Sequence, residues 1–194
     1  MKRMIVSGYV GDEWKEVVDA TWPSVESYAI RWGCVFHGCE MPRTKRHPPW
    51  SKLICIADAF SSADEVLWVD GDVMVADGSE SIFERVPPSA DHAACFLTDR
   101  NGEEHYNTGV WLLRKSMMPH LVSAAMDDDC VHHPWWEQMA INNIVRAGLV
   151  ETHPLGEEWN FWEGSPPDIH PRFRHSCGIR DRAARLSFLK GGSE

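Results

Sequence analysis

The feature that most constrains the fold of this chain is the alternation of short apolar runs with amphipathic stretches over residues 3–70. The runs "RMIVSGYV", "CVF" and "EVLWVD" are typical of strands, and Gly8 and Gly11 end the first of them. Between them, "VESYAIRWG" and "WSKLICIADAFSS" repeat apolar residues at spacings of three and four, which predicts helices. Because the strand runs are apolar throughout, we expect a mostly parallel, Rossmann-like sheet with helices on both faces.

The same alternation continues along the chain. The runs "AACFLT", "GVWLLR" and "VETHP" predict further strands, and "SMMPHLVSAAM" and "WEQMAINNIVRAG" predict helices. In the first helix, Ser24 is the expected N-cap beyond Pro23, and Gly33 is the expected end. The second helix is expected to bury one face, made of Leu53, Ile54, Ala57 and Phe60. A length of 194 residues favours a single α/β domain.

Composition narrows the functional classes. A net charge of −10 argues against a general nucleic-acid binder, because such proteins need excess Lys and Arg to neutralise phosphates. Ten tryptophans suit either a core filled by bulky side chains or a cleft that stacks planar and sugar rings. Six scattered cysteines without a C-x-x-C pair favour reduced core thiols, although a zinc site with histidines stays open.

The N-terminus predicts a cytoplasmic protein. Its apolar run is interrupted at Ser7 and Gly8. The run is therefore shorter than the apolar core of a signal peptide. No stretch approaches the ~18 apolar residues of a membrane span.

Two carboxylates, Asp70 and Asp72, follow the apolar strand "EVLWV". Ligands of parallel α/β sheets collect at the carboxyl ends of strands, so the pair is expected at such an edge. Neighbouring ionised carboxylates repel unless they face water or share a cation, and oxygen ligands favour Mg²⁺ or Mn²⁺. The segment "DDD" at 127–129 matches the same pattern, but it follows a helix and indicates a solvated end.

Several motifs together resemble a known family. "EVLWVDGDVMVAD" resembles the D-x-D strand of GT-A-fold glycosyltransferases, in particular families 8 and 34, where it binds Mn²⁺ against a nucleotide-sugar diphosphate. In the family's order, "YNTGVWLLR", "WEQMAINN", "LGEEWNFW" and "HSCG" resemble the later motifs. Upstream, "YAIRWG" and "PPWSKL" resemble the helix and Trp-Ser-Lys entry of family 34. The resemblance spans residues 1–178.

This resemblance implies a metal-dependent transferase that moves a hexose from a nucleoside-diphosphate sugar, with UDP expected, to a hydroxyl acceptor with retention of configuration. It implies Mn²⁺ or Mg²⁺ on Asp70, Asp72 and His175, and a catalytic set of Asn107, Glu137 and Gln138 near the reacting sugar. The implied donor contacts are Tyr9, Val10, Lys52, Asp70, Gly71, Asp72, Asn160, Gly178 and Arg180. The nucleotide-binding part is expected at 1–75, the acceptor and sugar part at 76–178, and a basic segment at 179–194.

The end of the chain departs from the family. Family 8 continues H-x-x-G-x-x-K-P-W, whereas "HSCGIRDRA" has Asp181 at the lysine position and leaves Arg180 or Arg182 to supply the charge. The basic segment is expected to contact an anionic membrane surface, to close over a diphosphate, or to pack as a solvated helix.

Each chosen residue also has a purely structural interpretation. Asn107 suits a turn, Glu137 and Gln138 suit a first helical turn, and the Lys52 stem suits an apolar surface. If the enzyme inverts, the base is expected among Asp99, Glu157 and Asp168.

Two other functions stay open: a metal-dependent nucleotidyltransferase or phosphohydrolase, and a catalytically silent sugar-nucleotide-binding protein. The sequence leaves open the donor sugar and the oligomeric state. For the acceptor, a glycan, a lipid-linked sugar and a protein all stay open.

Overall fold

The computed structural model describes residues 1–98 and 102–191, which form a central six-stranded sheet in the order β2-β1-β3-β6-β5-β7. β6 runs antiparallel to both of its neighbours, and the other adjacent pairs are parallel, which confirms the expected mostly parallel sheet. A second, two-stranded sheet pairs β4 with β8. The strands are β1 (Arg3–Tyr9), β2 (Val35–Glu40), β3 (Glu65–Asp70), β4 (Val73–Val75), β5 (His92–Thr98), β6 (Glu104–Arg114), β7 (Thr152–Leu155) and β8 (Phe173–His175).

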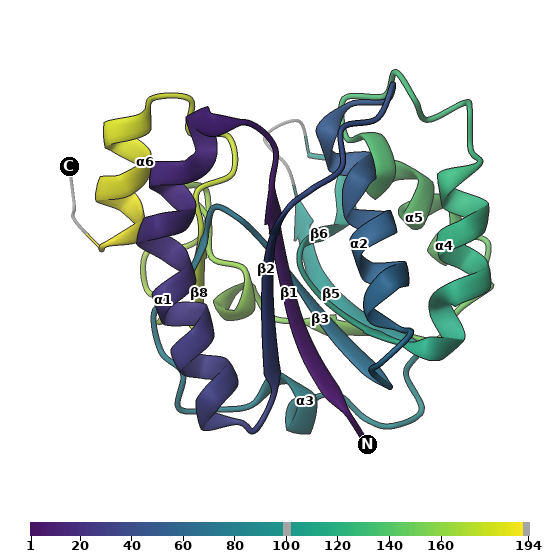
Figure 1. Ribbon diagram of the computed structural model, residues 1–194, viewed down its shortest axis with the longest axis horizontal. Helices are drawn as coiled ribbons and strands as arrows, with labels where there is room; N and C mark the ends of the chain where they lie inside the picture. The colour runs from purple at the N-terminus through teal and green to yellow at the C-terminus, as the bar shows by residue number, and fades with distance from the viewer. Residues whose placement is uncertain (99–101, 192–194) are drawn as a thin grey trace.

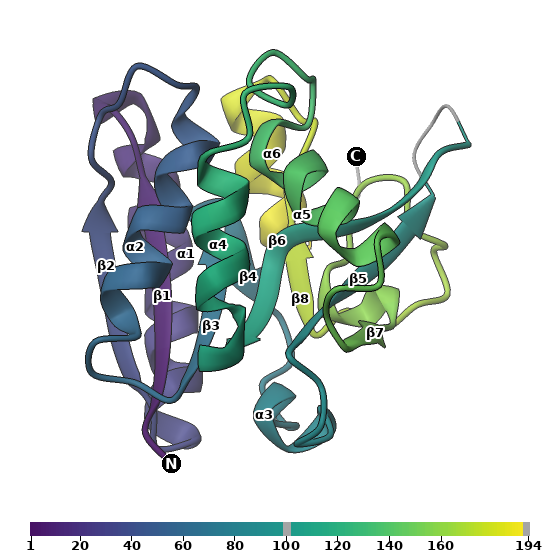
Figure 2. The same cartoon turned by 90° about the vertical axis from the view of Figure 1, so that its right-hand side faces the viewer.

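Helices cover both faces of the sheet (Figure 1). Figure 2 shows α2, α4 and α5 in front of the sheet and α1 and α6 behind it. The helices are α1 (Lys15–Arg31), α2 (Ser51–Ala59), α3 (Ile82–Arg85), α4 (Met118–Ala125), α5 (Trp136–Arg146) and α6 (Arg182–Leu189). None of the helices in the described part of the chain combines the length and apolarity that a membrane span requires.

Strand β3 shows why its sequence is apolar throughout. Val66 and Trp68 belong to the core cluster that packs under α2, α4 and α5. Leu67 and Val69 belong to the cluster under α1. Successive side chains of a strand point to opposite faces, so a central strand between two helical layers needs an apolar residue at every position.

Helix α1 begins earlier than we expected. It starts at Lys15 and contains Pro23, so Ser24 is not its N-cap. A proline inside a helix costs about 3 kcal/mol, which the burial of an apolar helix face on the sheet offsets. Ser24 Oγ instead donates to the Thr21 carbonyl and accepts from the Val75 amide, which fastens β4 to α1.

The buried face of α2 also differs from the prediction. Leu53, Ile56 and Phe60 are buried, whereas Ile54 is 48% exposed. Both faces satisfy a spacing of three and four. The helix face that is buried in the structure places Lys52 inside the protein, where two carboxylates pair with it.

One histidine lies in the core. His92 of β5 is fully buried, with Nδ1 3.1 Å from Trp111 Nε1 and Nε2 2.8 Å from Thr152 Oγ1. The indole N–H is a donor only, so Nδ1 accepts and the ring is neutral. Burial lowers the pKa of His92 to about 4.

Candidate active site

A cleft of about 740 Å³ opens near the carboxyl ends of β1 and β3, toward the top of Figure 1. Most residues for which the sequence predicted a role line it: Tyr9, Val10, Lys52, Asp70, Gly71, Asp72, Asn107, Glu137, Gln138, His175 and Gly178. Asn160 lies behind this surface and is 1% exposed, and Arg180 is not among the lining residues.

The acidic pair is shaped by the turn between β3 and β4. A Cβ on Gly71 would lie 2.8 Å from the Gly8 carbonyl oxygen, so only glycine lets the turn approach β1 this closely. The Gly71 carbonyl accepts a 2.8 Å hydrogen bond from Thr21 Oγ1 of α1. After the turn, β4 pairs with β8 in a register that sets Val73 opposite His175. This pairing brings a histidine from far along the chain beside Asp70 and Asp72.

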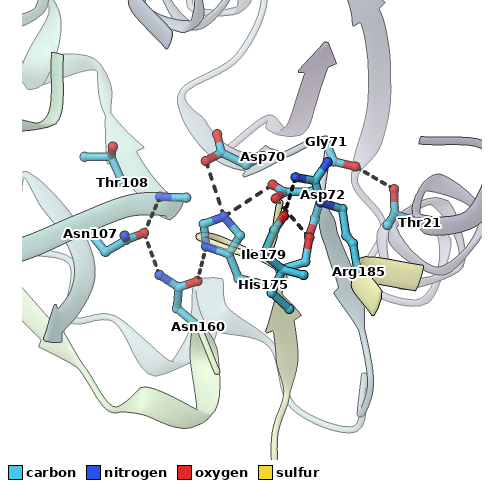
Figure 3. Close-up of polar contacts among 12 residues, drawn as sticks. Thr21, Asp70, Gly71, Asp72, Asn107, Thr108, Asn160, His175, Ile179 and Arg185 are labelled. Carbon is cyan, nitrogen blue, oxygen red and sulfur yellow. Dashed lines mark hydrogen bonds and ion pairs between the residues drawn. The ribbon is translucent and has the colours of Figure 1, made fainter. Parts of the chain in front are cut away.

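The three side chains converge on one point (Figure 3). His175 Nε2 lies 3.7 Å from Asp70 Oδ2 and 3.3 Å from Asp72 Oδ1. One ligand atom from each residue lies within 4.8 Å of the others. Among the described residues, this is the one group of His, Cys and acidic side chains that fits a metal ion, so the cysteine and histidine zinc site finds no support there.

A chain of amide contacts sets the tautomer of His175 (Figure 3). Asn107 Oδ1 accepts the Gly109 amide at 2.8 Å, so the oxygen of that side chain faces Asn160, which donates through Nδ2 at 2.7 Å. Asn160 therefore presents its oxygen to His175 Nδ1 at 2.9 Å, and Nδ1 carries the proton. In the neutral ring, Nε2 then directs a lone pair toward two carboxylates, an arrangement that requires a positive charge between them.

The pKa shifts of Asp72 and His175 agree with the requirement for a positive charge between the carboxylates. Burial would raise the pKa of Asp72, but attraction to His175 and hydrogen bonds from His175 and Ser176 lower it to about 2. Burial would lower the pKa of His175, but its interactions with Cys177 and the Asp72 carboxylate raise it above its usual value. The site thus stabilises either a proton on His175 or a bound cation, and Asp72 stays ionised in both cases.

Gly109 of the "NTG" motif makes room for the histidine. A Cβ at this position would lie 2.2 Å from His175 Cε1 and 2.6 Å from Nδ1. The glycine is therefore required by the ring that packs against β6, and Asn107 lies within this strand, where its side chain bonds both the Gly109 amide and Asn160.

Lys52 and Glu137 form a buried ion pair beside the cluster. Lys52 Nζ lies 3.0 Å from both Asp70 Oδ1 and Glu137 Oε1, and it is 4% exposed. Burial would lower the pKa of Lys52, but the two carboxylates raise it above its usual value. Thr108 Oγ1 donates to Glu137 Oε1, and Gln138 Oε1 accepts from the Thr108 amide. Glu137 Oε2 is buried and has no hydrogen-bond partner in the described part of the chain.

Some of the ten tryptophans lie in the core and others line the cleft. Trp50, Trp68, Trp111 and Trp159 lie in the core. Trp14, Trp135, Trp136 and Trp162 line the cleft.

Trp136 has an unusual backbone for a non-glycine residue, with φ at 42°. A left-handed conformation costs about 1–2 kcal/mol, so the surrounding contacts must hold it. Its ring stacks on His47 with a centroid distance of 3.9 Å and an interplanar angle of 3°. Trp135, the N-cap of α5, and Trp136 both line the cleft.

The arginines that follow Gly178 lie outside the cleft lining. Asp181 is the N-cap of α6, where its side chain accepts the Ala184 amide. Arg180 is exposed, Arg182 pairs with Glu16 at 2.8 Å, and neither of them lines the cleft.

Sequence reasoning missed Arg185 of α6. Its guanidinium lies 4.2 Å from the Trp14 ring centroid and donates to the Ile179 carbonyl at 2.7 Å. Its charge helps to lower the pKa of Asp72. Figure 3 shows the two side chains near each other. The i, i+3 spacing from Arg182 marks one helix face, but only the packing of α6 on α1 shows where that face lies.

The remaining acidic candidates lie away from the cleft lining. Glu157 and Asp168 do not line it, and Asp99 falls outside the described residues. In the 127–129 run, Asp127 caps the turn by accepting two backbone amides, and Asp128 pairs with Arg46.

No protein-family model and no curated protein sequence matches the chain. Among solved structures, a glycosyltransferase involved in the glycosylation of the major capsid of PBCV-1 matches with a TM-score of 0.82 and 20% identity, over 98% of this chain and 100% of that one. The galactosyltransferase LgtC, in complex with donor and acceptor sugar analogues, matches at 0.66 and 16%, over 97% and 95%.

The catalytic domain of Drosophila β1,4-galactosyltransferase 7 in complex with xylobiose matches at 0.61 and 14%, over 95% and 73%. These likenesses extend along nearly the whole chain and establish a shared architecture. The chain has the mixed α/β fold of the GT-A glycosyltransferases, with a paired-aspartate and histidine cluster at the carboxyl edge of its sheet.

Proposed function

We propose that this protein is a metal-dependent glycosyltransferase that moves a hexose from a nucleoside-diphosphate sugar, with UDP expected, to a hydroxyl acceptor. The observation that carries the proposal is the convergence of Asp70 Oδ2, Asp72 Oδ1 and the His175 Nε2 lone pair on one point. Two carboxylates and one imidazole suit Mn²⁺, with Mg²⁺ as the second choice. Two of the similar structures are galactosyltransferases, which supports a hexose.

A divalent cation, when bound by these three residues, would offset the negative charge of the departing diphosphate. The chain's own residues do the remaining work. Asn160 and Asn107 hold the His175 ring in one tautomer. Lys52 Nζ pairs with both Asp70 and Glu137, so the two carboxylates are fixed before any ligand arrives.

The sugar is expected beside Asn107, Glu137 and Gln138. Glu137 Oε2 is a buried acceptor without a partner among the described residues, and such an atom is suited to a sugar hydroxyl. Gln138 is held by its bond to the Thr108 amide, so its free amide group has a set direction. Tyr9, Val10 and Gly178 line the cleft and are expected to contact the nucleotide.

The proposed binding regions for the two halves of the reaction follow one another along the chain. Residues 1–75 contribute most of the nucleotide side, and residues 76–178 the sugar and acceptor side. Neither Glu157 nor Asp168 lines the cleft, which disfavours both as the base of an inverting reaction and supports retention. Product analysis by NMR of the new anomeric linkage tests this choice.

A thermal-shift panel of UDP-, GDP- and dTDP-sugars with Mn²⁺ tests the proposed function. Stabilisation grows with binding free energy, so the donor should give the largest shift. EDTA should abolish the shift and donor-dependent transfer, and Mn²⁺ should restore both. Transfer that persists in EDTA contradicts the metal role. Consumption of nucleoside triphosphates or phosphate esters without an acceptor supports a nucleotidyltransferase or phosphohydrolase instead, and tight UDP binding without turnover supports a silent binding protein.

A further inference from the structure

Three half-buried tryptophans line the cleft together with one short stretch of β6. Trp135 and Trp136 directly precede Glu137 and Gln138, which bond Thr108. Trp162 follows Asn160, which bonds Asn107. All three indoles, here called the tryptophan wall, line the same cleft as Asn107 and Thr108.

The tryptophan wall is held in place before any ligand binds. Trp136 stacks on His47, and Trp135 packs against His105 in a tilted arrangement, with a centroid distance of 4.0 Å and an interplanar angle of 33°. Trp162 lies against Gly164, where a Cβ would fall 2.3 Å from Trp162 Cη2. Rigid aromatic rings lose little conformational entropy when a ligand stacks on them.

The charge around the wall restricts the ligand. Among the described residues that line the cleft, Lys52 is the one Lys or Arg, and two carboxylates already hold its ammonium group. A phosphate-bearing ligand placed at the wall would find no uncommitted Lys or Arg among these residues. A pyranose offers an apolar C–H face for an indole and hydroxyls for the polar groups at its edge.

We propose that the tryptophan wall binds a neutral pyranose of a carbohydrate acceptor, so that the accepting molecule is an uncharged glycan chain. The inference rests on the proposed function, because it assigns the second substrate of the same site. It argues against an acceptor sugar whose phosphate or diphosphate lies at the wall, as in a lipid-linked sugar.

Saturation-transfer NMR of the full chain with UDP and Mn²⁺ tests the inference. The probes are the neutral disaccharides cellobiose, maltose and lactose, with glucose 1-phosphate as the charged comparison. We expect at least one disaccharide to bind, with the strongest transfer to C–H protons of one sugar face, and glucose 1-phosphate to bind more weakly. Trp162→Ala should weaken the binding about tenfold or more, whereas Trp162→Phe, which keeps a ring, should retain most of it.

Trp32→Phe is the matched control, because Trp32 is also half-buried but donates to the Gly78 carbonyl outside the cleft lining. It should bind the disaccharides like the wild type. No binding of any disaccharide, equal or tighter binding of glucose 1-phosphate, or unchanged binding by Trp162→Ala overturns the inference. The wild-type thermal shift with UDP and Mn²⁺ reports the proposed function separately, so the two failures are distinguishable.

Discussion

The asparagine behind the metal cluster allows a sharp test of how the cluster is organised. In Asn160→Ala, the His175 Nδ1 proton loses its acceptor at 2.9 Å, and Asn107 keeps its bond to Gly109. The ring is then free to rotate or to move its proton to Nε2, where the proton would occupy the position of a metal. Loss of such an orienting partner typically weakens metal affinity about 10–100-fold, which corresponds to about 1.4–2.7 kcal/mol.

The affinity for Mn²⁺ can be measured from the paramagnetic resonance signal of the free aqueous ion during titration of the protein. Asn142→Ala is the matched control, because Asn142 is 2% exposed and its side chain bonds Tyr106 and the Gln138 carbonyl, outside the cluster. We expect it to lower the free energy of unfolding and to leave the Mn²⁺ affinity within about twofold of the wild type. Wild-type affinity in Asn160→Ala would refute the argument that the amide chain directs the His175 lone pair.

Three further outcomes follow from the same contacts. Gly109→Ala should displace the His175 ring and abolish Mn²⁺ binding while circular dichroism shows a folded protein; retained binding contradicts the close packing. Lys52→Met should lower the free energy of unfolding by about 3–5 kcal/mol in urea titrations, and adding Glu137→Gln should recover part of the loss. Because the folded pKa of His92, about 4, lies below the usual 6.5, the unfolded chain binds more protons between these values, and stability should fall as the pH drops through that window. Urea titrations should show about 2 kcal/mol of this loss between about pH 7.5 and about pH 5, and a His92→Gln variant that keeps the full loss would contradict the assignment.

The sequence by itself determined the alternation of elements and the edge at which the chemistry lies. Apolar runs such as "EVLWV" fit only a strand covered on both faces, and carboxylates at its end must lie at the rim. The order of the later motifs indicated His175 as their partner, and the register of β4 with β8 confirms that the residues meet. These inferences succeed because periodicity and strand ends are local properties of the chain.

Only the tertiary structure decided which of several equivalent local patterns is used. Spacing allowed two faces of α2, and the pairing of Lys52 with Asp70 and Glu137 accompanies the one that is buried. The helix signal at Ser24 was overridden by packing of the preceding residues on the sheet, and the packing of α6 on α1 brings the charge of Arg185 near Asp72. Each of these outcomes depends on contacts between segments far apart in sequence, whose free energies exceed the local preferences of a cap, a proline or a single charge.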